Sequence, residues 1–249
     1  MGVLEIIRPI QSSKVTIVFP VHNEAGNLKR AIEETEDFLL KIRQDFEIII
    51  AEDGSTDGTG DIARGIADSN RRVRWIHHEE RLGRGRALSG AFRESEGSIL
   101  IFQDVDLSTD IRFLEPLIST IIDGYDIAIG SRTHPESRIR RSLKRTITSL
   151  MYNSLVRFIL GSKLKDHQCG FKAFKRNTFF DIMNDIYDEH WFWDTELLVL
   201  ATLKGFKIKE VPIVWRESNK STVILIKDSM NMASKIFRLW WRIKIIKAS

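Results

Sequence analysis

The stretch ILIFQDVDLSTD, Ile99 to Asp110, begins as an apolar strand and ends in acids. Asp104 and Asp106 follow the apolar run, and residues i and i+2 of an extended segment point to the same side. Two carboxylates that project together from a sheet edge repel each other unless a cation lies between them. A hard divalent ion such as Mg²⁺ or Mn²⁺ meets that need when substrate phosphates complete its ligands. The stretch therefore predicts a strand end with a metal site; the alternative is a loop of solvated acids with Asp110 capping a helix.

Short apolar runs alternate with helical patterns through the first half of the chain, which is typical of a parallel sheet built from strand-helix-strand units. The predicted strands are Val15 to Phe19, Glu47 to Ala51, Val73 to His77, Ser98 to Phe102 and Asp126 to Gly130. Helix-compatible patterns run over Asn27 to Ile42, Thr59 to Ala67, Arg84 to Ser95 and Phe113 to Ile122. We predict an α/β fold with a Rossmann-like, mostly parallel sheet flanked by helices, and functional residues at its carboxyl edge.

The second half of the chain is mainly helical, so a helical C-terminal elaboration of the sheet is expected. A helical pattern from Arg140 to Leu160 precedes the polar segment KDHQCGFKAF. A second one, from Trp193 to Lys204, precedes a strand from Ile208 to Trp215. Because repeats and an obvious linker are lacking, the simplest organisation is one domain over residues 1–222 followed by a helix over 223–249.

The tail from Val223 to Lys247 can form one basic amphipathic helix. Its apolar residues recur at spacings of three and four: Ile226, Met230, Ala233, Phe237 and Trp240. Its basic residues occupy another face: Lys235, Arg238 and Arg242. Two interpretations stay open. The helix rests on a membrane surface with its bases at anionic headgroups, or its apolar face packs on the rest of the chain or on a second copy in a homodimer.

The composition places the chain among globular proteins, since it has 249 residues of which 43% are hydrophobic. The single cysteine, Cys169, excludes an intrachain disulfide and a multi-cysteine zinc site and is compatible with a reducing compartment. The N-terminus has no signal-peptide pattern, and no window reaches the ~18 consecutive apolar residues of a membrane-spanning helix. We expect a cytoplasmic protein that acts peripherally, at the cytoplasmic face of a membrane.

Positive charge is concentrated in two segments, Arg132 to Arg145 and Lys227 to Lys247, although the net charge is only +4. Six basic residues and one acid lie between Arg132 and Arg145. One interpretation is a module that binds nucleic acid; another is a helix face whose bases are partly just solvated. Acidic clusters around Asp53 and Asp104 oppose a polyanion, so we expect no nucleic-acid partner.

Polar clusters also follow the first two predicted strands. In FPVHNEAGN, Pro20 ends or bends the strand, and a turn with a helix cap explains Asn23 but gives no role to His22 and Glu24. In AEDGSTDGTGD, turn chemistry explains most residues. Asp53 stands out there, because the first polar residue after a buried strand can hydrogen-bond a base or a ribose.

The segment RLGRGRALSG contains two glycines of a GxGxxG pattern, but Leu88 occupies the third position and the segment follows the third strand. Hydride chemistry on a dinucleotide is therefore disfavoured. A flexible basic loop that approaches phosphates remains, because glycines allow close approach and Arg81, Arg84 and Arg86 supply charge.

The polar segments FPVHNE, EDGSTDGT, LGRG, DVDLS and GSR all follow predicted strands or open the next helix, where a doubly wound sheet brings them together. As an ordered set, from about Lys14 to Ser221, they resemble the family 2 glycosyltransferases with the GT-A fold. Within that family the chain looks most like the polyprenyl-phosphate and dolichyl-phosphate sugar synthases. The spelling DHQCGFK, and GSR followed by arginines, are most similar to the dolichyl-phosphate β-glucosyltransferases.

The resemblance carries site residues onto matching positions. It implies a nucleoside-binding aspartate at Asp53 and a DxD metal motif at Asp104 and Asp106, with Ser108 where some relatives place a further ligand. In the FPVHNE segment, His22 stands where the family has a base-stacking tyrosine. The implied nucleotide-sugar residues are Pro20, His22, Glu24, Ala51, Asp53, Arg81, Asp104, Asp106, Arg132, Arg216 and Lys220.

The segments farther along resemble the family too. DHQCGFKAF matches its Asp-x-x-x-Gly-Phe segment, which places an aspartate at Asp166, and WFWDTELL matches Phe-x-Asp-x-Glu-Leu with Asp194 and Glu196. Asp166 is a base or an orienting group in this interpretation, or a turn residue in the plain one. Asp194 and Glu196 equally suit the start of a helix, where acids favour the dipole.

The implied reaction is inverting transfer of a hexose from a UDP- or GDP-sugar such as UDP-glucose to a dolichyl or polyprenyl phosphate, with Mg²⁺ or Mn²⁺ as cofactor. Asp166, Arg132 and Asp106 are then the candidate catalytic residues. Arg138 and Arg140 are candidates for the acceptor phosphate, since guanidinium groups bind phosphate oxygens bidentately. The alternative is a soluble glycosyltransferase of the same fold that acts on a glycan or a protein.

Overall fold

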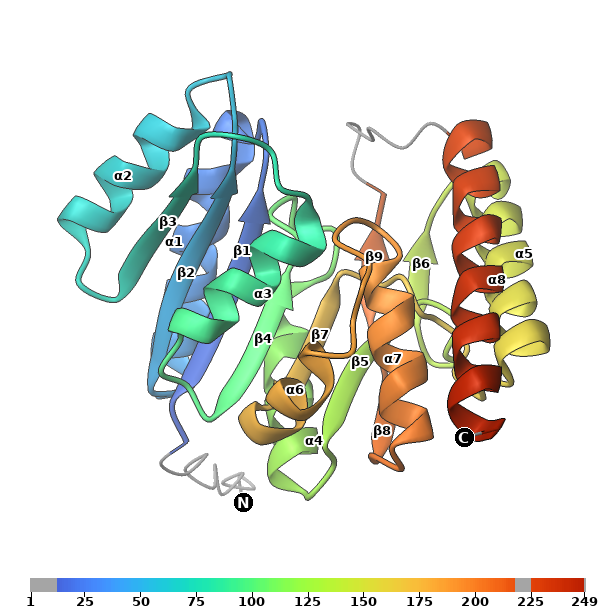
Figure 1. Ribbon diagram of the computed structural model, residues 1–249. Helices are drawn as coiled ribbons and strands as arrows, with labels where there is room; N and C mark the ends of the chain where they lie inside the picture. Colours follow the sequence, from blue (N-terminus) through green and yellow to red (C-terminus); the bar gives the residue numbers. More distant parts are fainter. Residues whose placement is uncertain (1–12, 218–224, 249) are drawn as a thin grey trace, which may run out of the picture.

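A seven-stranded sheet lies at the centre of the molecule in the order β3-β2-β1-β4-β7-β5-β8 (Figure 1). The computed structural model describes residues 13–217 and 225–248, with side chains over 13–217 and 232–245. The strands are β1 (Val15–Val21), β2 (Phe46–Asp53), β3 (Val73–His78), β4 (Ile99–Gln103), β5 (Ile127–Ser131), β7 (Phe171–Lys175) and β8 (Ile208–Pro212). Only β7 runs antiparallel to its neighbours, β4 and β5. The predicted mostly parallel sheet, with its five strands in the first half, is confirmed.

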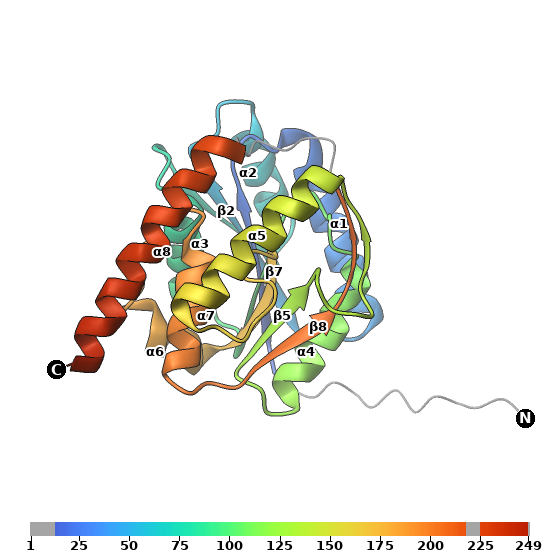
Figure 2. The ribbon, with the colours of Figure 1, turned by 90° about the vertical axis from the view of Figure 1, so that its right-hand side faces the viewer.

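Helices cover both faces of this sheet (Figures 1 and 2). One face packs on α1 (Ala25–Lys41), α2 (Thr59–Ser69) and α4 (Leu114–Ile122), which follows the short turn η1 (Ile111–Phe113). The other packs on α3 (Arg84–Glu94), α6 (Arg176–Met183) and α7 (Trp193–Leu203). Beyond α7, α5 (Leu143–Leu160) and α8 (Leu225–Ala248) lie side by side as an outer layer.

The strands are apolar on both sides because both faces of the sheet are covered. In β1, Ile17 and Phe19 enter the core beneath α1, whereas Val18 between them enters the core beneath α3. All three side chains are fully buried. Continuous apolar runs thus predicted these strands better than an alternating pattern would have.

The polar segment KDHQCGFKAF proves to contain a central strand, β7, which the sequence did not predict. The charged residue Lys172 made this segment resemble a polar loop. In the structure Lys172 is fully buried, and its ammonium binds the Asp194 carboxylate at 2.8 Å and the Cys169 carbonyl. A buried ion pair allows a lysine to lie in an apolar strand. The partner is on α7, far along the chain, so no local pattern shows it.

The predicted strand from Ile208 to Trp215 is divided at Ile213. Its first part is β8, and its second part, β9 (Val214–Arg216), pairs in parallel with β6 (Arg138–Arg140) in a separate two-stranded sheet. The division places Arg138, Arg140 and Arg216 together on one two-stranded sheet.

The described part of α8 packs on the domain, but through a different stripe from the predicted one. Ile236 and Leu239 are buried against the core beneath α7, whereas Phe237 is 60% exposed. Arg242 pairs with Glu196 at 2.6 Å and Lys235 with Asp188 at 2.5 Å. The predicted stripe begins at side chains outside the described set, Ile226 and Met230.

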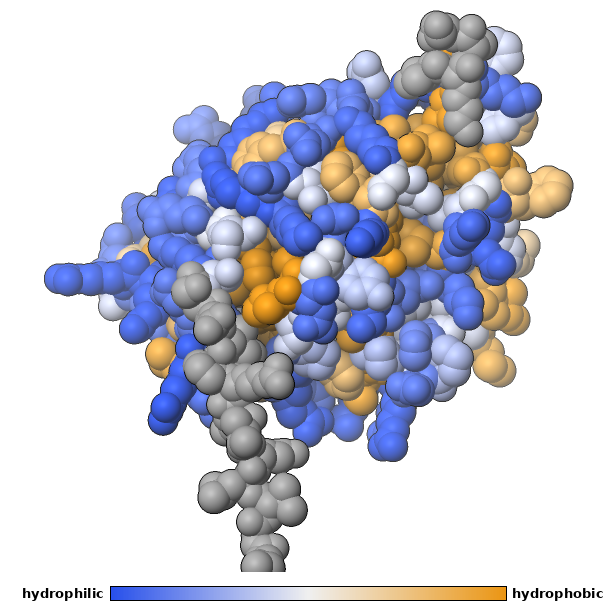
Figure 3. Space-filling view, turned by 90° about the horizontal axis from the view of Figure 1, so that it is seen from below, coloured by the Kyte–Doolittle hydropathy of each residue, from blue (hydrophilic) through white to orange (hydrophobic). Residues whose placement is uncertain are grey.

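Apolar side chains also reach the surface. Seen from below, they gather on the side of the molecule where α5 and α8 lie (Figure 3). Among the helices that the structure describes, none has the length and apolar character needed to cross a membrane.

Two glycines of α3 should respond oppositely to alanine. A Cβ on Gly85 would lie 2.5 Å from Trp193 Cγ, whereas one on Gly90 meets nothing within 4 Å. We expect Gly85→Ala to lower the free energy of unfolding by about 1–3 kcal/mol through overpacking, and Gly90→Ala to raise it by about 0.5–1 kcal/mol through helix propensity. Urea denaturation of both variants measures this. Equal effects would mean that α3 does not pack on α7 as described.

Candidate active site

The site lies at the carboxyl edge of the sheet, where polar loops follow β1, β2, β4 and β5. The loops after β1 and β2 are joined by hydrogen bonds. His22 Nδ1 lies 2.8 Å from the Asp53 carbonyl oxygen, and Asn23 Oδ1 accepts from the Thr56 amide at 2.8 Å. Glu24 accepts from the Asn27 side chain at 2.7 Å, at the start of α1. The two loops therefore form one rigid rim.

Asp53 organises the glycine-containing loop that follows β3. Its two carboxylate oxygens accept from the amides of Leu82 at 2.6 Å and Gly83 at 2.9 Å. Gly83 has a φ of 102°, which a residue with a side chain rarely adopts. Arg81, at the exposed part of this loop, extends into solvent beside the rim. The predicted nucleoside-binding aspartate thus also holds the loop that carries the arginines.

Pro20 and Ala51 lie at the floor of this rim, since they are register partners in β1 and β2. Ala51 is fully buried. They shape the backbone there and present no polar side chain.

Asp104 and Asp106 lie where the first stretch of sequence placed them, just beyond β4. The Asp104 amide donates to the Gly170 carbonyl at 3.0 Å, and a Cβ on Gly170 would come within 1.8 Å of Asp104 Oδ2. Asp106 accepts from the Ser108 amide at 2.9 Å and from its hydroxyl at 2.6 Å. Glycine at position 170 therefore leaves the room that the Asp104 carboxylate occupies.

The two carboxylates fit a hard divalent ion, because their oxygens are the donors that Mg²⁺ and Mn²⁺ prefer. Desolvation raises the pKa of Asp104 above its ordinary value; the Arg84 guanidinium opposes that shift and the Asp106 carboxylate adds to it. Within the described residues, no group of three His, Cys, Asp or Glu side chains could hold a metal. Other ligands would have to come from a phosphate-bearing substrate and water.

Arg84 is the site residue that sequence analysis assigned only as loop charge. Its guanidinium bridges Asp104 and Asp194, at 2.6 Å from each carboxylate, and lies over the Phe102 ring. Asp194 in turn pairs with the buried Lys172. The signal for Arg84 was its place as the first residue of α3, between Gly83 and Gly85. Asp194 had been weighed as a helix-terminal acid.

Arg132 and Asp166 form the second charged pair of the edge. The Asp166 carboxylate accepts from Arg132 Nε at 2.7 Å, Nη2 at 2.8 Å and the amide at 2.9 Å, and it is fully buried. Burial acts to raise the pKa of Asp166, but the ion pair and hydrogen bonds to Arg132 hold it far below its ordinary value. Asp166 is therefore an ionised group that fixes Arg132 in place.

Arg141 is a second functional candidate that the sequence did not single out. Its guanidinium and that of Arg132 lie over the same Trp215 ring, at 5.6 and 5.8 Å from its centroid. Desolvation and the neighbouring Arg132 lower the pKa of Arg141 to about 10. Its Nε is buried and has no hydrogen-bond partner among the described residues. Arg132 is paired with Asp166, whereas Arg141 has no acid within ion-pair distance among the described residues, so the two guanidinium groups have the charge and geometry to bind an anion.

Three of the remaining predicted residues are on the two-stranded sheet of β6 and β9. Arg138 and Arg140 are exposed on β6. Arg216, also exposed, is the register partner of Arg140, and its amide donates to the Ser108 carbonyl at 2.8 Å. Lys220 lies outside the described residues.

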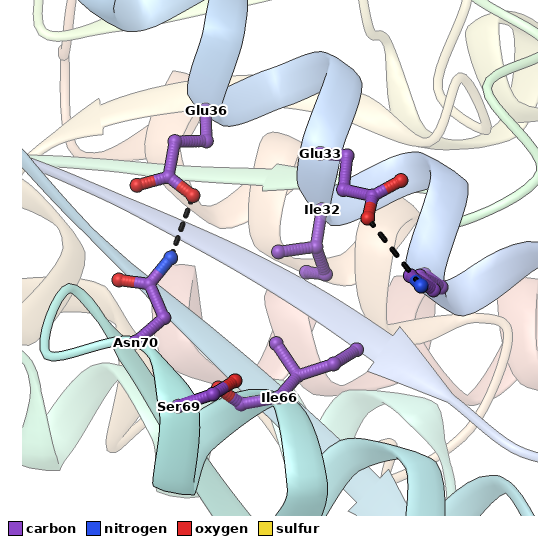
Figure 4. Close-up of a pocket in the computed structure, with 7 residues that line it drawn as sticks. Ile32, Glu33, Glu36, Ile66, Ser69 and Asn70 are labelled. Atoms are coloured by element: carbon purple, nitrogen blue, oxygen red, sulfur yellow. Dashed lines mark hydrogen bonds and ion pairs between the residues drawn. The ribbon is translucent and has the colours of Figure 1, made fainter.

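A small pocket between α1 and α2 is separate from this edge (Figure 4). Glu36 accepts a hydrogen bond from Asn70 across it at 2.6 Å, and Lys29 pairs with Glu33 on its rim. None of the predicted site residues lines it.

His167, next to Asp166, is fully buried and neutral. Its Nδ1 donates to Asn153 Oδ1 at 2.8 Å and its Nε2 accepts from the Ser162 hydroxyl at 2.8 Å. Desolvation lowers the pKa of His167 to about 4. The DHQC segment is thus held by hydrogen bonds to an imidazole whose burial disfavours the charged form.

Two solved structures with this fold are sugar-transferring enzymes by name. Glucosyl-3-phosphoglycerate synthase from Mycobacterium tuberculosis, in complex with Mn²⁺, UDP and glucosyl-3-phosphoglycerate, superposes with a TM-score of 0.65 and 19% identity, over 92% of this chain and 78% of that one. Mannosyltransferase PcManGT from Pyrobaculum calidifontis, in complex with GDP-Man and Mn²⁺, gives a TM-score of 0.60 and 17% identity, over 92% and 66%. The fold and the paired carboxylates at its edge define the GT-A class.

The sequence profile of glycosyl transferase family 2 matches residues 16–182, and the chain belongs to this family. It is 43% identical to glycosyltransferase AglD of Haloferax volcanii over 93% of this chain, and it spans 38% of that protein's length. It is 32% identical to dolichyl-phosphate beta-glucosyltransferase of Saccharomyces cerevisiae, over 89% of this chain and 72% of the yeast protein. The Drosophila melanogaster enzyme of the same name is 30% identical, over 95% and 79%.

Acid should destabilise the protein through His167. Its pKa of about 4 in the folded state lies below the ordinary 6.5, so the unfolded chain binds more protons between these values. The contribution of the neutral His167 imidazole to the free energy of unfolding is therefore fully present above pH ~6.5. It falls, by about 3 kcal/mol in all, as the pH drops to ~4. We expect His167→Gln to flatten this part of the profile, measured by urea denaturation at pH 7, 5.5 and 4.5. Identical pH dependence in both proteins would contradict a buried neutral imidazole.

Proposed function

We propose that the protein transfers a hexose, with inversion, from UDP-glucose or another UDP- or GDP-hexose to a dolichyl or polyprenyl phosphate. The observation that carries the proposal is the opposition of charges at one sheet edge. Asp104 and Asp106 suit a metal-bound diphosphate, and Arg132 and Arg141 suit a second phosphate. The two groups are close enough that Asp104 is among the charges that raise the pKa of Arg132.

The relatives support this choice of substrates. Two of those described above are named for transfer of glucose to dolichyl phosphate. The structural neighbours were solved with UDP or GDP-mannose and Mn²⁺, which supports a nucleotide sugar and Mg²⁺ or Mn²⁺ here. Because the chain spans 38% of AglD, the activity of that whole protein enters only as support.

In this mechanism the donor lies over the rim formed by the loops after β1 and β2. The residues that we propose around it are Pro20, His22, Glu24, Ala51, Asp53, Arg81, Asp104, Asp106, Arg132, Arg216 and Lys220. A divalent ion held by Asp104 and Asp106 would neutralise the diphosphate and improve it as a leaving group. Arg84 fixes the Asp104 carboxylate toward that position.

The acceptor needs positioning more than deprotonation. A phosphate monoester has a second pKa near ~6 and is already largely an anion at neutral pH. Arg132 and Arg141 would hold its oxygens, with Arg138 and Arg140 as the outer part of the same basic surface. Since its low pKa makes Asp166 a weak base, the geometry favours its orienting role through Arg132.

The proposal places the protein peripherally at the cytoplasmic face of a membrane, where a lipid acceptor is reached from the surface. The one cysteine, Cys169, is free and buried, in keeping with a reducing compartment. The alternative acceptor is a soluble glycan or protein, and the assay below includes that case.

Sugar transfer from a panel of UDP- and GDP-hexoses to dolichyl phosphate, with and without Mg²⁺ or Mn²⁺, tests the function. We expect a metal-dependent lipid-linked sugar, and a loss of about a hundredfold or more in kcat/KM for Asp106→Asn because charge stabilisation at the diphosphate is removed. Asp68→Asn, an exposed acid of α2, is the matched control. If the protein binds a nucleotide sugar but transfers the hexose only to a soluble glycan or protein, the lipid acceptor is wrong and the soluble acceptor takes its place. Absence of nucleotide-sugar binding would refute the function.

The arginines can be ranked by the same assay. Arg141→Gln should raise the KM for the lipid phosphate about 10- to 100-fold, the value of a charge-assisted hydrogen bond, with donor binding unchanged. Arg138→Gln, an exposed arginine three residues away, should change it less. If Arg138→Gln has the larger effect, the acceptor phosphate binds on β6 and not at Trp215.

A further inference from the structure

One face of α5 exposes a continuous stripe of large apolar side chains. Leu143 is 81% exposed, Ile147 57%, Met151 69% and Phe158 90%. Leu150 and Leu155 are also exposed on this helix. Spacings of three and four place all of them on one side. Soluble monomers rarely leave so contiguous an apolar surface bare, and such surfaces mark interaction sites.

The neighbouring helix α8 extends this surface. Phe237 is 60% and Trp241 63% exposed, one helical turn apart. The stripe that packs inward on the domain is a different one, with Ile236 and Leu239. Because α5 and α8 lie side by side in the outer layer (Figures 1 and 2), we take their exposed apolar side chains together and call them the α5–α8 face.

Positive charge surrounds this surface. The α5 helix contains no acid from residue 143 to 160, and the described side chains of α8, residues 232–245, include none. The exposed bases on these helices and on β6 are Arg138, Arg140, Lys144, Arg157, Arg238 and Lys244. An apolar stripe bordered by bases suits an apolar layer with an anionic surface.

The α5–α8 face also begins at the proposed phosphate site. Leu143, the first residue of α5, comes two positions after Arg141. The first turn is fixed there, because Glu217 accepts from the Ser142 amide at 2.7 Å and pairs with Arg145 at 2.9 Å. A phosphate bound between Arg132 and Arg141 would therefore lie at one end of the apolar stripe.

We propose that the α5–α8 face docks on an anionic lipid surface, with α5 lying in the headgroup region and its N-terminus presenting the arginine pair to a lipid phosphate. Interfacial helices bind this way, with the apolar face buried and bases at the headgroups. Charge argues against a second copy as the occupant, since a two-fold contact would bring the same basic rims together. Only one part of this proposal rests on the proposed function, namely that the arginine pair binds a lipid phosphate.

Co-sedimentation of the full chain with vesicles tests this docking. We expect binding to phosphatidylcholine vesicles that contain phosphatidylglycerol, weakened by salt, and little binding to phosphatidylcholine alone. The double substitution Met151→Glu with Phe158→Glu should lower the bound fraction at least about tenfold by removing apolar burial. Ile122→Glu on α4 replaces an apolar residue that is 48% exposed elsewhere and should leave binding unchanged.

Other outcomes decide against the docking. If the wild type ignores anionic vesicles at low salt, or the double variant binds as well as the control, the proposal is wrong. Light scattering that shows a dimer lost in the double variant would reassign the face to a second copy. Calorimetry with UDP-glucose and GDP-mannose separates the two proposals. Vesicle binding without nucleotide-sugar binding leaves docking intact but refutes the function, and the reverse leaves the function and refutes docking.

Discussion

The largely buried guanidinium of Arg84 makes the contacts on which the active-site edge depends. It joins Asp104 beyond β4 to Asp194 at the start of α7, and Asp194 continues to Lys172 in β7. Four elements are thereby held in one arrangement of alternating charges. Removing one partner of a buried pair leaves an uncompensated charge, which costs far more than the pair contributes. The position of the Asp104 carboxylate, a predicted metal ligand, is therefore set by Arg84 and, through it, by Asp194 and Lys172.

The second charged pair, Arg132 with Asp166, arranges the other half of the edge in the same manner. The Asp166 carboxylate accepts three hydrogen bonds from Arg132, and Trp215 places a second guanidinium beside that of Arg132. Trp215 belongs to β9, so the division of the predicted strand at Ile213 is what brings this ring across. Acids therefore lie on one side of the edge and arginines on the other, which are the two halves to which we assign the two phosphate groups of the proposed reaction.

The outer helices α5 and α8 connect the arginine side of this edge to the exposed apolar surface. Buried residues of α8 hold it against α7, while α5 keeps its apolar stripe outside. Since α5 starts directly after Arg141, its direction and exposed face follow from the same turn that shapes the arginine pair. The position of the α5–α8 face relative to the active-site edge is thus fixed by the turn that joins Arg141 to α5.

Local signals in the sequence determined the parts of this protein that depend on neighbours along the chain. Continuous apolar runs predicted β1 to β5, helical periodicity predicted α1 to α5, and the spacing of Asp104 and Asp106 predicted a paired carboxylate edge. Those signals exist because a strand buried on both faces needs apolar residues throughout and an extended backbone aligns residues two apart.

Tertiary structure alone decided which charges meet. Lys172 makes the sequence of β7 look polar, and its buried partner, Asp194, is 22 residues away, where no local pattern shows it. Asp166 looked like a free base because its partner, Arg132, lies 34 residues before it. Arg84 and Arg141 gained their roles in the same way, from contacts across elements. The physical reason is that burial makes a charge depend on its partner, and the partner is chosen by the packing of the sheet and helices, which no local pattern records.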